Sequence, residues 1–198
     1  MRWIQLDSFS SLVEEYRSKD GVADLFGVIL YTDEHPNIKK TLRDDDYWLS
    51  LHELTGNRFC VFSVKPKKGR YEWPSFPKGV IGRMVQIWEE PAENKRLIDV
   101  FELKNTTKLP ILLLFTGVDN KWLKIELELD DSTQENAFSS LRKQLQFSCD
   151  SLAQIKEENI KNSEGLYAAM SMHKDHRDRW NFLKKGVDIY AYIKTLLP

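Results

Sequence analysis

Apolar and polar positions follow the clearest pattern between residues 104 and 130. Residues 111–115 are continuously apolar, as in a strand that is covered on both faces. From residue 123 to 130, leucine or isoleucine alternates with lysine, glutamate or aspartate, as in a strand with one face in water. Glycine, aspartate and asparagine between the two runs favour a turn. The pattern predicts two consecutive strands, with Pro110 at the start of the first because proline donates no ladder hydrogen bond.

Similar patterns elsewhere predict a mixed α/β chain. Apolar runs at 25–31 and 58–64 are typical of core strands, and residues 3–6 favour a short opening strand. Helical spacing follows each of these runs, whereas no strand pattern appears after residue 146. The predicted helices begin near residues 8, 36, 46, 92 and 132. We therefore expect an α/β domain over residues 1–145 and a helical extension over 146–198 that packs on it.

Two helix starts carry capping signals. Ser132 and Glu135 are spaced as in a capping box, which predicts a helix directly after the second strand of the 104–130 segment. Among Asp44, Asp45 and Asp46, any one can cap the helix that follows. Pro36 is expected in the first turn of the helix after residue 31.

Composition limits the classes of function. The 198 residues include 41% hydrophobic ones, enough for a substantial core, and the net charge is −1. Such a balance provides no general attraction to nucleic acid or to anionic membranes. No apolar run approaches the roughly 20 residues of a membrane span, and residues 2–21 are amphipathic, unlike a signal peptide. Cys60 and Cys149 lie far apart, so we expect reduced thiols, a cytoplasmic location and no cofactor.

The predicted order from residue 25 onward is β-α-β-α-β-β-α, with Pro110 just before the third of these strands. This order resembles the thioredoxin-like fold, in which a cis proline precedes the strand that faces the active site; Lys108-Leu109-Pro110-Ile111 stands at the matching place. The resemblance covers roughly residues 1–145. The sequence itself leaves the isomer of the Leu109–Pro110 bond open.

The redox motif of that family has two cysteines separated by two residues at the start of the helix after the first core strand. Here that place is occupied by Glu34-His35-Pro36-Asn37. Pro36 falls where many thioredoxins have proline, but both cysteines are missing. Disulfide exchange needs a thiolate, so the resemblance implies the fold without the redox activity.

Asp33, Glu34 and His35 form the first candidate ligand site, with Pro110 opposite. They follow a predicted core strand, and ligands favour the carboxyl ends of strands in open α/β sheets. Their oxygen and imidazole groups are able to hold a divalent metal. In the alternative interpretation, which we favour, Asp33 or Glu34 caps the next helix and His35 is solvated, since acids are common at helix starts.

Other polar clusters have plainer explanations. The aspartates at 44–46 offer oxygen ligands for a cation, but capping explains them. In the stretch with His173, Asp175, His176 and Asp178, the two histidines lie three residues apart and share a helical face, where one further carboxylate from elsewhere is able to complete a metal site. Interleaved Lys and Arg residues favour a solvated, salt-bridged face instead. Cys60 is interpreted as an inert core thiol, whereas Cys149 is ambiguous.

The sequence contains no catalytic constellation, and we therefore predict a non-catalytic protein-interaction or accessory module. Its expected partner is another protein or a second copy. Aromatic residues favour interfaces, and the candidates are Trp73, Phe76, Trp88 and Trp122. One alternative is an enzyme or ligand-binding protein that uses the site near His35. Another is a nucleic-acid accessory protein, which would use the basic and aromatic loop at 65–73.

Overall fold

A computed structural model describes residues 1–4, 9–56, 58–64, 92–103, 108–118 and 121–178. Within these ranges the helices and strands are β1 (Arg2–Ile4), α1 (Phe9–Arg17), β2 (Phe26–Leu30), α2 (Pro36–Arg43), α3 (Asp45–Thr55), β3 (Cys60–Val64), α4 (Ala92–Val100), β4 (Ile111–Val118), β5 (Lys121–Glu128), α5 (Gln134–Ala153) and the 3₁₀ helix η2 (Glu157–Asn159), followed by helical residues 163–178. The predicted mixed α/β class is confirmed.

The strands form one five-stranded sheet in the order β1-β3-β2-β4-β5. Strands β1 and β2 run parallel to β3, whereas β4 runs antiparallel to both β2 and β5. The register pairs Val28 with Leu113 and Leu114 with Ile125. All five residues of β2 are buried, whereas only Ile125 and Leu127 of β5 are buried and the other six residues are partly or fully exposed. The two strands predicted after Pro110 are therefore confirmed, and β5 lies at an end of the sheet.

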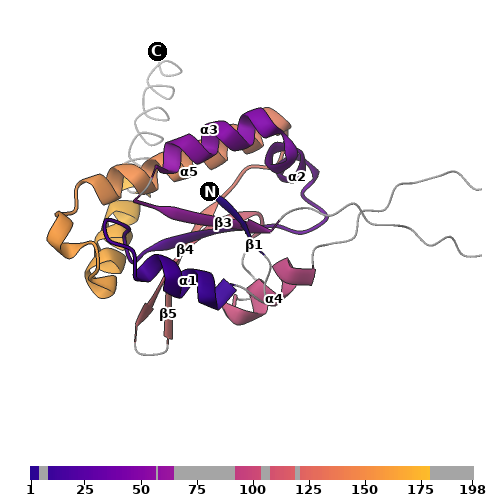
Figure 1. The fold of residues 1–198 in the computed structure, drawn as a ribbon. Coiled ribbons are helices and arrows are strands. Elements are labelled where there is room, and N and C mark those ends of the chain that lie inside the picture. The colour runs from indigo at the N-terminus through magenta and orange to yellow at the C-terminus, as the bar shows by residue number, and fades with distance from the viewer. Residues whose placement is uncertain (5–8, 57, 65–91, 104–107, 119–120, 179–198) are drawn as a thin grey trace, which may run out of the picture.

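Helices cover both faces of the sheet (Figure 1). On one face, Ile29, Leu112 and Leu114 pack with apolar residues of α2, α3, α5 and the 163–178 helix. On the other, Phe26 and Phe115 pack with residues of α1 and α4. These two clusters explain the continuous apolar runs in β2 and β4, because successive side chains of a central strand must enter opposite cores.

One capping prediction is confirmed and the other is wrong. Asp44 caps α3, since its side chain accepts hydrogen bonds from the N–H groups of Asp46 and Tyr47. At α5, however, the N-cap is Thr133, whose side chain accepts from Asn136 N–H at 3.1 Å. Ser132 instead donates its N–H to Asp130. That local turn delays the helix start, so the capping box at Ser132 does not form.

Residues beyond α5 belong to the same core. Helix α5 runs unbroken from residue 134 to 153, so the predicted boundary at 145 falls inside a helix. Ile160, Leu166 and Met170 are buried in the cluster under α3 and α5. The apolar residues of the expected helical extension therefore pack in the same core as those on one face of the sheet.

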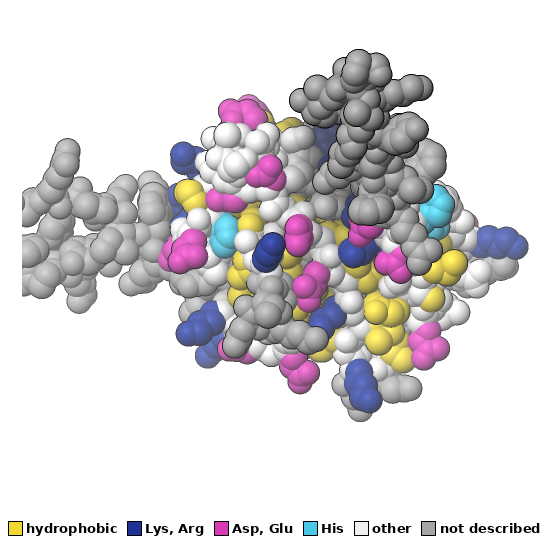
Figure 2. All heavy atoms as spheres, turned by 180° about the vertical axis from the view of Figure 1, so that it is seen from behind, with side chains coloured by type: hydrophobic (Ala, Val, Ile, Leu, Met, Phe, Trp, Pro, Cys, Tyr) yellow, Lys and Arg dark blue, Asp and Glu magenta, His cyan; other side chains and the backbone are white. Residues whose placement is uncertain are grey.

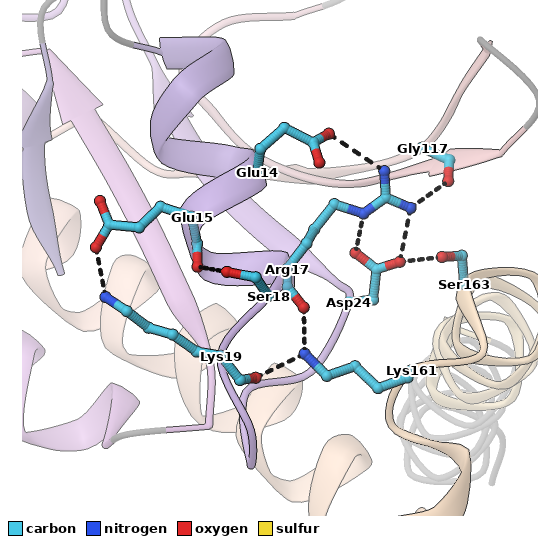
Figure 3. A network of polar contacts seen from close by, with 9 residues as sticks. All are labelled: Glu14, Glu15, Arg17, Ser18, Lys19, Asp24, Gly117, Lys161 and Ser163. Atoms are coloured by element: carbon cyan, nitrogen blue, oxygen red, sulfur yellow. Dashed lines mark hydrogen bonds and ion pairs between the residues drawn. The ribbon is translucent and has the colours of Figure 1, made fainter.

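A polar network anchors this extension (Figure 3). Asp24, just before β2, forms an ion pair with Arg17, whose Nε lies 2.8 Å from Oδ1. Its Oδ2 accepts hydrogen bonds from Arg17 Nη2 at 3.0 Å and from the Ser163 hydroxyl. Arg17 Nη2 further donates to the Gly117 carbonyl at 3.2 Å. Lys161 Nζ donates to the Arg17 carbonyl at 2.6 Å. The network therefore joins α1, β2, β4 and the first residue of the 163–178 helix.

Candidate functional site

The first candidate site lies where the loop after β2 meets the Leu109–Pro110 peptide, which is cis. Thr32 N–H donates to His35 Nδ1 at 3.0 Å, and His35 Nε2 lies 2.9 Å from the Leu109 carbonyl oxygen. Because Nδ1 accepts a backbone bond, the ring proton is assigned to Nε2, which donates to Leu109. His35 therefore connects the β2–α2 loop to the residue before Pro110.

Asp131, in the connection from β5 to α5, caps the start of α2. Its Oδ1 accepts the N–H of Ile38 at 2.5 Å, and its carbonyl accepts from Asn37 Nδ2 at 2.6 Å. His35 holds the N-cap position but provides no side-chain cap. Burial raises the pKa of Asp131, while the bond from Ile38 N–H opposes the shift. A carboxylate from the chain itself thus occupies the anion-attracting end of this helix.

Asp33 is held by a lysine of α2. Lys39 Nζ lies 2.6 Å from Asp33 Oδ1 and donates to the Asp33 carbonyl at 3.1 Å. Only 9% of the Lys39 side chain is exposed. Glu34 is exposed and Pro110 is buried. The loop therefore folds back on α2 through Asp33, and Glu34 is the acid that it presents to solvent.

These contacts correct the capping interpretation. Neither Asp33 nor Glu34 caps α2, and His35 bonds to protein atoms on both ring nitrogens. Sequence reasoning missed Asp131, which lies 93 residues from Ile38 in the chain. No signal near Asp131 in the sequence points to the start of α2, because the two segments are distant along the chain.

The cysteines do not supply redox chemistry at this corner. Cys60 is buried in β3, and Cys149 donates to the Leu54 carbonyl at 3.5 Å. Burial raises the pKa of Cys149 to about 11. A thiol with such a pKa is almost entirely protonated at neutral pH and is a poor nucleophile.

Within the described ranges, no three His, Cys, Asp or Glu side chains come together as a potential metal site. The histidine pair His173 and His176 lies on a salt-bridged helix, where Lys174 and Arg177 lie 3.2 and 3.5 Å from Asp178. This arrangement agrees with the solvated face that we favoured there. Asp44 is occupied as a helix cap.

A groove of about 1040 Å³ forms a second candidate site. It lies among β5, α5 and the 163–178 helix. Its walls carry five acidic and five basic side chains, namely Glu102, Glu126, Glu128, Asp175, Asp178, Lys108, Lys124, Lys143, Lys174 and Arg177. Acidic and basic side chains are likewise intermixed on the face of the molecule shown in Figure 2. Such a lining suits a polypeptide better than an apolar small molecule.

Of the four predicted interface residues, the structure describes Trp122. Trp122 is 37% exposed, and its ring lies 5.8 Å from Phe101 and 5.4 Å from Phe115. It therefore packs against the core on the α4 side and remains partly exposed. Trp73, Phe76 and Trp88 lie outside the described residues, as does the basic loop at 65–73.

Comparison with protein-family models, with curated proteins and with solved structures finds no match for this chain. Of the helices that the structure describes, none has the length and apolar character to cross a bilayer.

Proposed function

We propose that this chain is a non-catalytic protein-interaction module on a degenerate thioredoxin-like fold, docking a partner protein or a second copy. One observation carries the proposal. The corner where that fold would place its redox motif is filled by internal contacts: His35 uses both ring nitrogens, and Asp131 caps α2. The fold assignment is supported by the element order from β2 onward and by the cis Leu109–Pro110 bond.

The contacts at this corner argue against acid–base catalysis as well as against redox chemistry. A general base needs an available lone pair within hydrogen-bond reach of its substrate. The Nδ1 lone pair of His35 accepts from Thr32, and its Nε2 proton is directed to Leu109. A ligand near Asp33 and His35 would have to displace these bonds and the Lys39 pair. This cost disfavours the alternative of a ligand-binding protein.

The fold is tested by restoring the missing motif. With dithiothreitol as the electron donor, wild-type protein is expected to leave the rate of insulin reduction unchanged. Glu34→Cys/Asn37→Cys is expected to form an internal disulfide, to be reduced to the dithiol by dithiothreitol and to accelerate insulin reduction by exchange. Glu34→Ser/Asn37→Ser is the matched control. Acceleration of insulin reduction by the wild type would refute the non-catalytic assignment. Absence of disulfide formation in a folded double-cysteine variant would refute the thioredoxin-like assignment.

The interaction role is tested by native mass spectrometry of the protein isolated from its host. A stoichiometric protein partner or a homodimer is the expected result. A monomer that carries a small-molecule mass would favour the site near His35 instead. Loss of that mass in a folded Glu34→Ala/His35→Ala variant would then locate the ligand at this corner.

A further inference from the structure

We infer that β5 pairs edge to edge with β5 of a second copy of this chain, through cross-strand pairing of Lys124 and Glu126. The inference rests on the proposed function and names its partner. Two features carry it: the position of β5 at the end of the sheet, and the distribution of charge along its eight residues.

Strand β5 lies at an open end of the strand order. In the part of the chain that the structure describes, it pairs with β4 alone. An edge strand presents unpaired N–H and C=O groups along its outer side, and these groups are a template for another strand. The eight paired residues of β5 make this edge long enough for a stable ladder.

The groove described above follows this edge. Lys124, Glu126 and Glu128 belong to one face of β5, whereas Ile125 and Leu127 belong to the other, because side chains alternate along a strand. All five residues line the same groove, although the side chains of Ile125 and Leu127 are buried. A groove that is lined by five consecutive residues of one strand runs along that strand. An extended backbone therefore has room beside β5.

Charge along β5 is arranged so that the strand complements itself. Its first half carries Lys121 and Lys124, and its second half carries Glu126 and Glu128. In an antiparallel pair with Ile125 opposite Ile125 of the second copy, each Lys124 faces a Glu126. Opposite charges placed directly across two strands stabilise the pair. A parallel arrangement in register would instead place like charges side by side.

The register is also determined by charge. A shift that places Lys124 opposite itself, or Glu126 opposite itself, creates a like-charge pair on the two-fold axis, which destabilises the ladder. A slip that places Lys124 opposite Ile125 pairs a polar position with an apolar one. The pairing centred on Ile125 avoids all of these conflicts. Lysines alone at an edge would repel a second copy, so the two glutamates are what make β5 self-complementary.

Lys124 is compatible with this role. Its Nζ donates to the backbone carbonyls of Phe101 and Glu102 at the end of α4. An ammonium group has three donors, so it can keep both bonds while it donates to a carboxylate. The two carbonyl bonds hold the Lys124 head group in place.

The test is a charge-reversal experiment read by native mass spectrometry and light scattering across a dilution series. Wild-type protein is expected to dimerise. Lys124→Glu and Glu126→Lys are each expected to weaken the dimer by about tenfold or more, since two attractive pairs become two repulsive ones. A mixture of the two variants is expected to form heterodimers, and the double reversal in one chain is expected to restore the homodimer.

Matched controls reverse exposed charges elsewhere, Lys95→Glu on α4 and Glu53→Lys on α3, and should leave the dimer unchanged. Circular dichroism checks that each variant is folded. If a reversal unfolds the chain, the neutral Glu126→Gln replaces it and should weaken the dimer less. A monomeric wild type, a dimer insensitive to the reversals, or a mixture without heterodimers would overturn the inference. None of these outcomes affects the insulin assay, which tests the proposed function separately.

Discussion

Replacing Arg17 by alanine should destabilise the protein more than the loss of any exposed ion pair. Asp24 is only 5% exposed, and Arg17 supplies it with donors at 2.8 and 3.0 Å. The bond to Asp24 raises the pKa of Arg17, so the guanidinium stays charged throughout the accessible pH range. In the alanine variant, the buried carboxylate of Asp24 loses its contacts with Arg17 and keeps the hydrogen bond from the Ser163 hydroxyl. The Gly117 carbonyl loses its hydrogen bond from Arg17.

The cost follows from the burial of the two partners. Removing one partner of a fully buried ion pair costs about 3–5 kcal/mol. The Arg17 side chain is 35% exposed, so water partly screens this pair and the lower end of that range applies. We expect Arg17→Ala to lower the free energy of unfolding by about 3 kcal/mol. For a chain of this length, that change lowers Tm by roughly 6–12 °C.

The assay is urea unfolding followed by circular dichroism and by tryptophan fluorescence, with thermal unfolding as a second measurement. Arg58→Ala is the matched control, because Arg58 also pairs with the C-terminal part, at 2.9 Å from Glu157, but both side chains are more than half exposed. It should cost less than about 1 kcal/mol. Equal losses in the two variants would refute the importance of the buried network.

Three further predictions concern single side chains. Cys149 should react with a thiol reagent at pH 8 far more slowly in the native protein than in denaturant, because a pKa of about 11 leaves about one thiolate in a thousand; equal rates would contradict its burial. Folding raises the pKa of Asp131, so its protonated form stabilises the folded protein. This contribution is fully present at a pH below the pKa of the unfolded chain, and it is lost as the pH rises through the pKa of the folded chain. Asp131→Asn should therefore gain stability relative to the wild type as pH rises above the ordinary aspartate pKa of about 4 in urea unfolding, and a constant difference would count against the shift. Asp44→Ala should cost about 1 kcal/mol in the same assay because α3 loses its cap, whereas Asp45→Ala should cost less; the reverse order would identify Asp45 as the cap.

The features that could be predicted from the sequence are those that depend on residues close together along the chain. The strands β4 and β5 followed from periodicity because each position along a strand faces a fixed side of the sheet. The capping of α3 by Asp44 followed because its partners lie two and three residues away. The error at Ser132 was also local, since the turn formed with Asp130 competes with a capping box of the expected spacing.

The contacts of the candidate site were beyond sequence reasoning because they join distant segments. His35 meets Leu109 across 74 residues, and Ile38 meets Asp131 across 93. Pattern placed His35 and Pro110 at the same corner through the resemblance, but it did not show whether His35 faced solvent or protein. That distinction decides whether the corner is available for chemistry, and only the folded arrangement supplies it.

A hydrogen-bonding group that already has a partner within the chain is less available to a second molecule. For this reason the β5 edge is a better binding site than the corner at His35. A partner at the corner must first break the bonds of His35 and the cap from Asp131, each worth about 1 kcal/mol or more. Along the outer edge of β5, the main chain has no hydrogen bonds to another described strand that a partner would first have to break. Each ladder bond there replaces a bond to water, and opposite charges add to the gain. The contacts of the described residues therefore favour the β5 edge over the corner at His35 as the place where the proposed second copy binds.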